Sequence, residues 1–137
     1  MTEQPRPFPW RSPGVWLTLL ISLMMGFNAW QAFTQPQAFA ARFGLPDAAE
    51  ASAAFVTVYA SRALFLAVIA AVLVAVRQFR ALAWFAAIAV VMPLADAAQV
   101  SAAGGVQAIV TRHLIIAGYL VLTAALLFRT ARQEVQA

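Results

Sequence analysis

Five polar residues of this sequence lie inside long apolar stretches, where such side chains are costly and need an explanation. They are Asn28, Tyr59, Arg62, Asp96 and His113. A guanidinium stays charged in proteins and pairs well with oxygen anions, so Arg62 is predicted to anchor the polar end of a ligand. Tyr59 and Asn28 are the other predicted ligand-binding residues. Asp96 and His113 are the hypothetical catalytic residues, because a carboxylate and an imidazole can exchange protons near neutral pH.

The same residues also have a structural interpretation. Arg62 and Asp96 are expected to form an ion pair, since an unpaired guanidinium inside a membrane is expensive. Such a pair would also act as a clasp that holds two helices in register. His113 would then be a hydrogen-bonded interfacial residue, and Arg112 would extend its long stem to the lipid headgroups. Both interpretations stay open at the level of the sequence.

The elements that must position these side chains are four apolar stretches of about the length that a membrane span needs. They cover approximately residues 15–33, 53–76, 81–100 and 106–128. Of the 137 residues, 64% are hydrophobic and only 10% are charged, which is more apolar surface than a soluble domain of this size can bury. We therefore expect an all-α bundle of four transmembrane helices that forms a single integral membrane domain, residues 1–137.

The arginines set the expected orientation of this bundle. Six of the nine arginines flank the span ends on one side, and the positive side of a membrane protein faces the cytoplasm. This predicts cytoplasmic N- and C-termini and a multi-pass protein of the cell inner (plasma) membrane. The alternative is a cleaved signal peptide that ends near residues 38–40. Trp16 and Trp30 favour a retained span, because they suit the two interfacial ends of the first apolar stretch.

In this orientation the polar residues share one depth. Counted at about 1.5 Å per residue, all five lie in the outer half of the bilayer, although they come from four spans. Polar groups face the interior of a membrane bundle because lipid cannot satisfy them. The sequence thus predicts one partly buried cluster that opens towards the outer face.

Proline, glycine and alanine predict the finer features. The segment 36–43 is expected to be a short amphipathic helix in the first outer loop, ended by Gly44 as its C-cap. Pro93 should kink the third span, because proline cannot donate the backbone hydrogen bond of a helix. A ridge of alanines every four residues on the second span is interpreted as a bundle contact rather than a dimer face. Its members are Ala63, Ala67, Ala71 and Ala75.

Several kinds of site have no motif in this sequence. There is no cysteine, no glycine-rich phosphate loop, no HExxH and no GxSxG, and one histidine cannot build a typical zinc or haem site. We therefore expect no metal and no cofactor. The arginines form no nucleic-acid patch, so the expected partners are the lipid bilayer and a small lipophilic ligand. A homo-oligomer remains open.

The order of these features resembles an uncharacterised, DoxX-like family of small four-helix bacterial membrane proteins, a domain of unknown function. The resemblance covers residues 20–128. Members often have glycine in place of Ser61, and an acidic or amide residue in place of Ala63. The resemblance implies no activity. The residues that carry it are Pro36, the segment 43–46, Tyr59, Ser61, Arg62, the segment 93–96, Gly104, Gly105 and His113.

The sequence therefore predicts an integral membrane protein that binds a small lipophilic or amphipathic molecule at its outer-half polar cluster. One alternative is a cofactor-free acid–base membrane enzyme of the isomerase or cyclase type. Another is a structural subunit of a membrane complex. Whether the protein is an enzyme stays open.

Overall fold

The computed structural model describes residues 8–43 and 53–136, and every regular element in these ranges is an α-helix. Four helices are long and apolar enough to cross a membrane, counting α4 and α5 as one. The all-α, four-span prediction is thereby confirmed. The elements are α1 (Pro13–Thr34), α2 (Pro36–Phe43), α3 (Ala53–Ala75), α4 (Phe79–Ala89), α5 (Val91–Ala102) and α6 (Gln107–Gln136).

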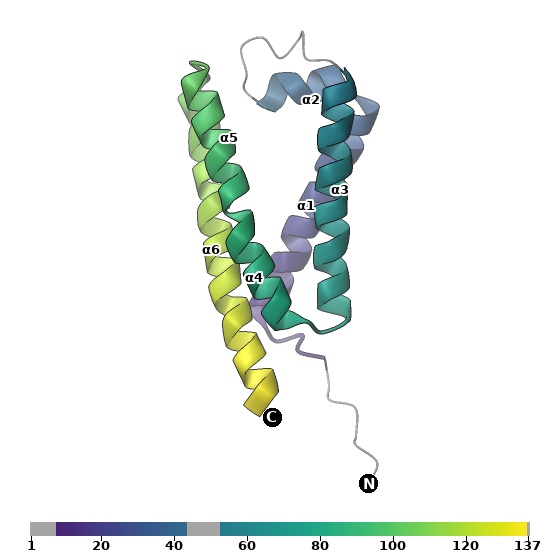
Figure 1. The fold of residues 1–137 in the computed structure, drawn as a ribbon, viewed down its shortest axis with the longest axis vertical. Helices are drawn as coiled ribbons and strands as arrows, with labels where there is room; N and C mark the ends of the chain where they lie inside the picture. Colours follow the sequence, from purple (N-terminus) through teal and green to yellow (C-terminus); the bar gives the residue numbers. More distant parts are fainter. Residues whose placement is uncertain (1–7, 44–52, 137) are drawn as a thin grey trace.

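The helices form two groups that meet at one end. The first group is α1 packed along α3, and the second is α6 packed along α4 and α5. The groups come together near α4 and diverge towards α2, which lies across the wide end (Figure 1). Both described chain ends lie at the narrow end. The bundle is therefore closed by helix packing at the narrow end and open above it.

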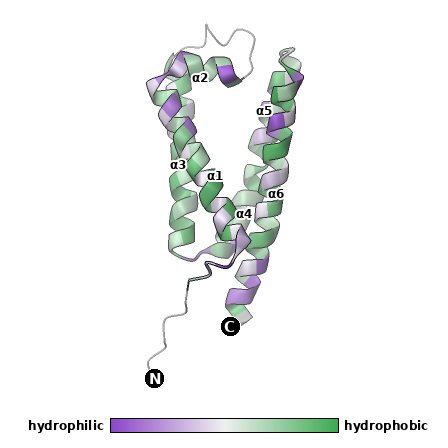
Figure 2. Ribbon diagram, turned by 180° about the vertical axis from the view of Figure 1, so that it is seen from behind, coloured by the Kyte–Doolittle hydropathy of each residue, from purple (hydrophilic) through white to green (hydrophobic). Residues whose placement is uncertain are grey.

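The surface of the long helices is apolar. Leu23 is 71% exposed and Phe55 is 79% exposed, values that water would penalise and lipid would not. Hydrophobic residues follow the four long helices, whereas hydrophilic residues gather at α2 and at the C-terminal end of α6 (Figure 2). This distribution fits a bundle whose sides contact the bilayer.

The narrow end holds the tightest packing of the described residues. Val15, Leu82 and Leu127, from α1, α4 and α6, are fully buried there. Gly14 lies so close to α6 that a Cβ atom on it would be 3.0 Å from the backbone nitrogen of Leu127. A glycine at this position lets two helix backbones approach closely, as is common in membranes.

Hydrogen bonds reinforce this crossing of α1 and α6. The Tyr119 hydroxyl donates to the backbone oxygen of Leu17 at 2.6 Å. One turn further down, the hydroxyls of Ser12 and Thr130 are 2.5 Å apart. A hydrogen bond between helices in lipid contributes roughly 0.6 kcal/mol on average. The two contacts therefore fix the position of α1 against α6 more than they add stability.

The third span is broken, as Pro93 predicts. Helix α4 ends at Ala89, and α5 begins at Val91. Pro93 has no N–H to donate to Ala89, and its ring clashes with that carbonyl. The next bond, from Leu94 N to Val90 O, is long at 3.4 Å. The break lets α4 contact α3 at the narrow end while α5 diverges from it.

The turn between α5 and α6 contains two glycines, Gly104 and Gly105. Gly104 has a φ of +69°, in the left-handed region that glycine tolerates best. Its N–H donates to Ser101, and the N–H of Gly105 donates to Val100, which is the Schellman arrangement. The chain therefore reverses within a few residues, and α6 returns alongside α5.

Two finer expectations have different outcomes. The predicted short helix has the bounds Pro36–Phe43, while its proposed cap, Gly44, lies outside the described residues. The predicted alanine ridge is only half correct, since Ala63 and Ala67 are buried but Ala71 and Ala75 are exposed. A spacing of four drifts by about 40° per step around a helix of 3.6 residues per turn. The buried stripe therefore continues through Ala70 and Val74 instead.

Candidate functional site

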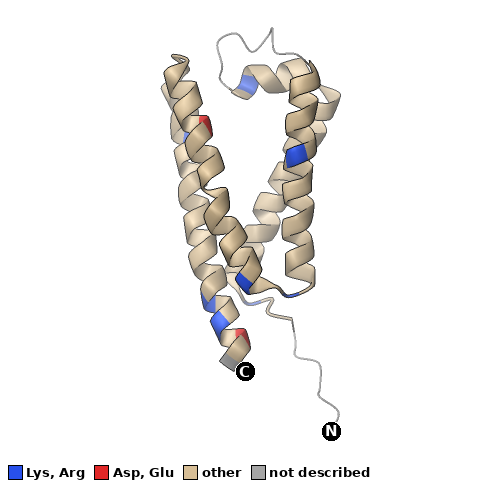
Figure 3. Ribbon diagram, in the orientation of Figure 1, with Lys and Arg blue, Asp and Glu red and all other residues tan. Residues whose placement is uncertain are grey.

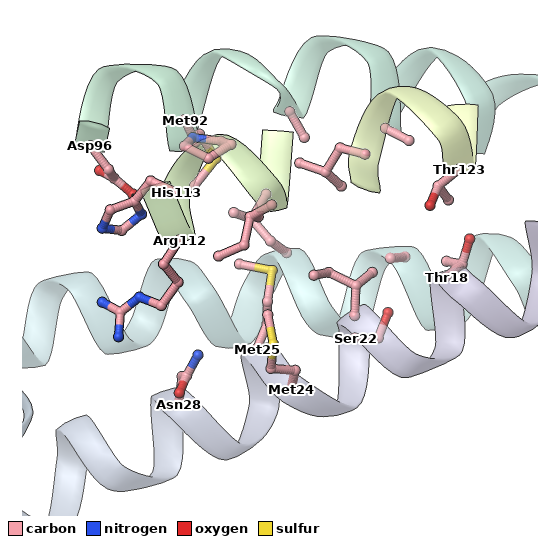
Figure 4. Close-up of a pocket in the computed structure, with 18 of the residues that line it drawn as sticks. Thr18, Ser22, Met24, Met25, Asn28, Met92, Asp96, Arg112, His113 and Thr123 are labelled. Carbon is pink, nitrogen blue, oxygen red and sulfur yellow. The ribbon is translucent and has the colours of Figure 1, made fainter. Parts of the chain in front are cut away.

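A cavity of about 340 Å³ fills the space between the two diverging helix groups. All six helices contribute residues to its wall. Thr18 of α1 and Thr123 of α6 lie at its narrow end, and Asp96, Arg112 and His113 lie at the opposite end, nearer α2 (Figure 4). The break in the third span is the structural cause of this space, because it turns α5 away from α3.

The two ends of the cavity differ in chemistry. The part towards α4 is apolar, with side chains such as Leu66, Phe85 and Leu120. At the other end the wall is polar, and its charged or polar members are Asn28, Gln31, Arg42, Tyr59, Asp96, Arg112 and His113. A cavity with an apolar body and a few convergent polar groups is the usual form of a small-molecule site.

Four of the five predicted site residues meet at this polar end. Asn28 from α1, Tyr59 from α3, Asp96 from α5 and His113 from α6 all line the cavity. The four side chains come from four helices, as predicted from their common depth along the spans.

Asp96 and His113 form the closest pair of titratable groups among these residues. The His113 Nδ1 atom lies 3.8 Å from an Asp96 carboxylate oxygen, beyond hydrogen-bond distance but within ion-pair range. The His113 side chain is 7% exposed, and its Nε2 atom is buried with no hydrogen-bond partner in the described part of the chain. The Phe43 ring of α2 packs against the imidazole, with centroids 5.4 Å apart.

Arg112 is the cavity-lining cation on α6. One of its terminal nitrogens donates to the backbone oxygen of Arg42 at 3.2 Å. This bond and the ring contact between Phe43 and His113 both join α2 to α6. The Arg112 side chain is exposed and extends from α6 towards α1 (Figure 4). Its contact with the lipid headgroups stays a prediction.

Arg62 does not line the cavity, and the expected ion pair with Asp96 is absent. Its side chain is exposed, and within the described residues its guanidinium has no hydrogen bond or ion pair. On an ideal helix Arg62 points about 40° away from Leu66, which does line the cavity. Helix α3 packs against α1 and α4, whereas α5, which carries Asp96, packs against α6. A clasp between Arg62 and Asp96 is therefore not formed.

The methionines were missed by the sequence reasoning. Met24, Met25 and Met92 line the middle of the cavity (Figure 4). Met24 is 39% exposed and Met92 is 40% exposed, although both lie near the middle of membrane-length helices. If the long helices cross a bilayer, exposed side chains at this level face lipid chains. An unbranched, polarisable thioether adapts to varied apolar shapes. The sequence offered two signals, the adjacent methionines Met24 and Met25 in the first span and Met92 beside Pro93. Taken alone, methionines at such positions resemble ordinary core residues.

Within the described residues, no group of three or more His, Cys, Asp or Glu side chains could hold a metal ion. The polar end instead offers two guanidiniums, one carboxylate, one imidazole, a phenol and two amides. These groups suit hydrogen bonding and charge pairing with an oxygen-rich head group.

Comparison with known proteins gives a family and no activity. No curated protein and no solved structure matches the chain significantly. One family model matches residues 20–127, a range that contains every cavity-lining residue except Thr18. The chain thus belongs to the family described as "Domain of unknown function (DUF4267)".

Proposed function

We propose that this protein binds a small amphipathic molecule within the bilayer, with the polar end of that molecule directed towards α2. The observation that carries the proposal is the cavity of about 340 Å³, apolar along its body and charged at one end. Ligand cavities in proteins have volumes of roughly 300–1,000 Å³ and combine apolar walls with a few fixed polar groups. The exposure of Met24 and Met92 near the middle of their helices supports entry from the membrane rather than from water.

The orientation and location are part of this proposal. Five of the eight described arginines lie at the narrow end, where both chain ends lie, whereas Arg42, Arg62 and Arg112 lie in the wider half of the bundle (Figure 3). The five at the narrow end are Arg11, Arg77, Arg80, Arg129 and Arg132. By the positive-inside rule the narrow end would face the cytoplasm, and α2 with the polar end of the cavity would face outward. The bacterial inner membrane and a DoxX-like relationship remain our interpretation of the sequence.

Identification of the bound molecule tests the proposal directly. The full chain, purified in a mild non-ionic detergent, would be extracted and the extract compared by mass spectrometry with that of two variants. Ala89→Phe places a ring in the cavity wall, whereas Ala71→Phe adds the same ring to the exposed surface of α3. We expect one lipophile that is retained with wild type and Ala71→Phe and lost with Ala89→Phe. Equal amounts in all three preparations, or none in any, would contradict the proposal.

A second candidate is acid–base catalysis in the same cavity. The observation that favours it is the 3.8 Å separation of His113 and Asp96 at the cavity wall, with the second imidazole nitrogen buried and without a partner in the described part of the chain. A base and an acid this close could move a proton within a bound substrate. The test is whether the mass spectrum or isomer composition of the bound molecule changes on incubation with wild type but not with Asp96→Asn. If the ligand is unchanged after incubation with either protein, catalysis is contradicted and only the binding function is left.

A further inference from the structure

We infer that the cavity selects a single-chain carboxylate amphiphile, an anion of the fatty-acid type, whose head group is held by Arg112 with Arg42 beside it. This inference rests on the proposed function and adds the charge, the head group and the approximate length of the ligand. It follows from the charge balance of the polar end, the hydrogen-bonding capacity of Arg112 and the volume of the cavity.

The charge balance is positive in every protonation state of Asp96 and His113. Arg42 and Arg112 are permanently charged, and together they contribute +2. Asp96 contributes at most −1, and His113 contributes 0 or +1. With Tyr59 neutral the described lining keeps a net charge of at least +1, although both arginines are exposed, and this favours an anionic head group over a neutral or cationic one. One monoanionic head group is the smallest compensation that suffices.

Arg112 is the lining cation with the clearest capacity for such a head group. A guanidinium has five N–H donors, and only one hydrogen bond from Arg112 to the described residues is formed, to Arg42 O. Its side chain extends from α6 towards α1, where Asn28 offers an amide from the other wall (Figure 4). A planar carboxylate can accept two parallel bonds from a guanidinium, which an alcohol or a quaternary ammonium group cannot.

Arg42 is the second positive group at this head site. Its Nε atom donates to Ala38 O at 3.2 Å, which holds the side chain back along its own helix α2. The backbone oxygen of Arg42 in turn accepts the bond from Arg112. Helix α2 thus contributes both a charge and the acceptor that orients Arg112 over the cavity.

The volume suits a ligand with one chain of medium length. About 340 Å³ lies at the small end of the roughly 300–1,000 Å³ that ligand cavities span. Decanoate is a probe of this kind, whereas a diacyl lipid is far larger. Below the head site, Met24, Met25 and Met92 form an adaptable apolar wall for such a chain.

Binding of radiolabelled decanoate to the full chain in uncharged nanodiscs, at mildly alkaline pH, tests the inference. Decanamide has the same length and carbonyl but no charge, and decyltrimethylammonium carries the opposite charge. We expect decanamide to compete about 10- to 100-fold more weakly than unlabelled decanoate, the loss typical of a charge-assisted hydrogen bond. The cationic amphiphile should not compete.

Variants assign the selectivity to residues. We expect Arg112→Gln to weaken decanoate binding at least about tenfold and to leave decanamide binding nearly unchanged, with Arg42→Gln giving a smaller effect of the same kind. Arg80→Gln, at the opposite end of the bundle, is the matched control. Arg62→Gln shows whether the exposed arginine of α3 contributes. If decanoate affinity falls only in Arg62→Gln, the assignment to Arg112 is wrong.

The outcomes separate this inference from the proposed function. Equal affinities for decanoate and decanamide would overturn the carboxylate inference and leave binding of an amphiphile standing. Failure of all three amphiphiles, together with no lipophile in the extract, would remove both. An equal loss of both ligands in Arg112→Gln would show a role in folding and refute charge recognition, and Arg42→Gln then provides the independent second test.

Discussion

Replacement of Gly14 by alanine should destabilise the bundle, although alanine is the better helix former. A Cβ atom at this position would lie 3.0 Å from Leu127 N and 3.2 Å from the Leu126 carbonyl carbon and Cβ. Carbon atoms pack best at about 3.5–4.0 Å, so α1 must move back from α6 by about 0.5 Å. Overpacking of this kind typically costs about 1–3 kcal/mol.

Gly26 supplies the matched control on the same helix. No atom lies within 4 Å of a Cβ built on Gly26, so Gly26→Ala introduces no steric conflict. This variant should only gain helix propensity, about 0.5–1 kcal/mol. Gly14 lies in the first turn of α1, where the propensity gain is smaller. We therefore expect the free energy of unfolding of the two variants to differ by about 1–4 kcal/mol, with Gly14→Ala the less stable.

Reversible unfolding in mixed detergent micelles, followed by tryptophan fluorescence, measures this difference. Gly14→Ala should unfold at a lower denaturant fraction than wild type, and Gly26→Ala at an equal or higher one. If Gly14→Ala proves as stable as Gly26→Ala, the close approach of α1 and α6 is not the contact that closes the narrow end. The contact between α1 and α6 would then not be what holds the cavity open above it.

Three further substitutions test other contacts by the same unfolding measurement. Tyr119→Phe removes the hydroxyl that donates to α1 and should lower the free energy of unfolding by about 0.5–1.5 kcal/mol. Tyr59→Phe is the control, because the Tyr59 hydroxyl makes no hydrogen bond to the described residues, and it should change this free energy little. Ser22→Ala removes a buried hydroxyl without a described partner and should raise stability by up to about 1 kcal/mol; a loss would reveal a bond to this hydroxyl. Glu134→Gln removes the negative charge that accepts the two bonds of 2.8 and 2.9 Å from Arg77, and should cost at most about 1 kcal/mol, less at high salt; a salt-independent loss would contradict an ion-pair origin.

The fold was predictable because its causes are local in the sequence. Apolar length predicts the four long helices, and Pro36 and Pro93 predict a helix start and a helix break. Each of these features depends on the chemistry of one segment, without knowledge of its neighbours.

The candidate site was only partly predictable, because it depends on which helix faces come together. The positions of Asp96 and His113 along their spans correctly predicted that the two residues lie at one level. The same reasoning wrongly paired Asp96 with Arg62. The direction taken by α5 after the break at Pro93 decides that pairing, and no spacing in the sequence gives it. The bond from Arg112 to α2 was not predicted for a related reason, since the position of α2 relative to α6 was unknown.

The grouping of the helices has a consequence for biogenesis. Helices α1 and α3 precede α4, α5 and α6 in the chain, so each group is built only from residues adjacent in the order of synthesis. Each hairpin can therefore assemble as it leaves the translocon, with little need for distant segments. The cavity comes into existence only when the second hairpin docks on the first. A chain divided between the two hairpins and expressed as two pieces should consequently reassemble, and any molecule held between them would be enclosed at the last step of assembly.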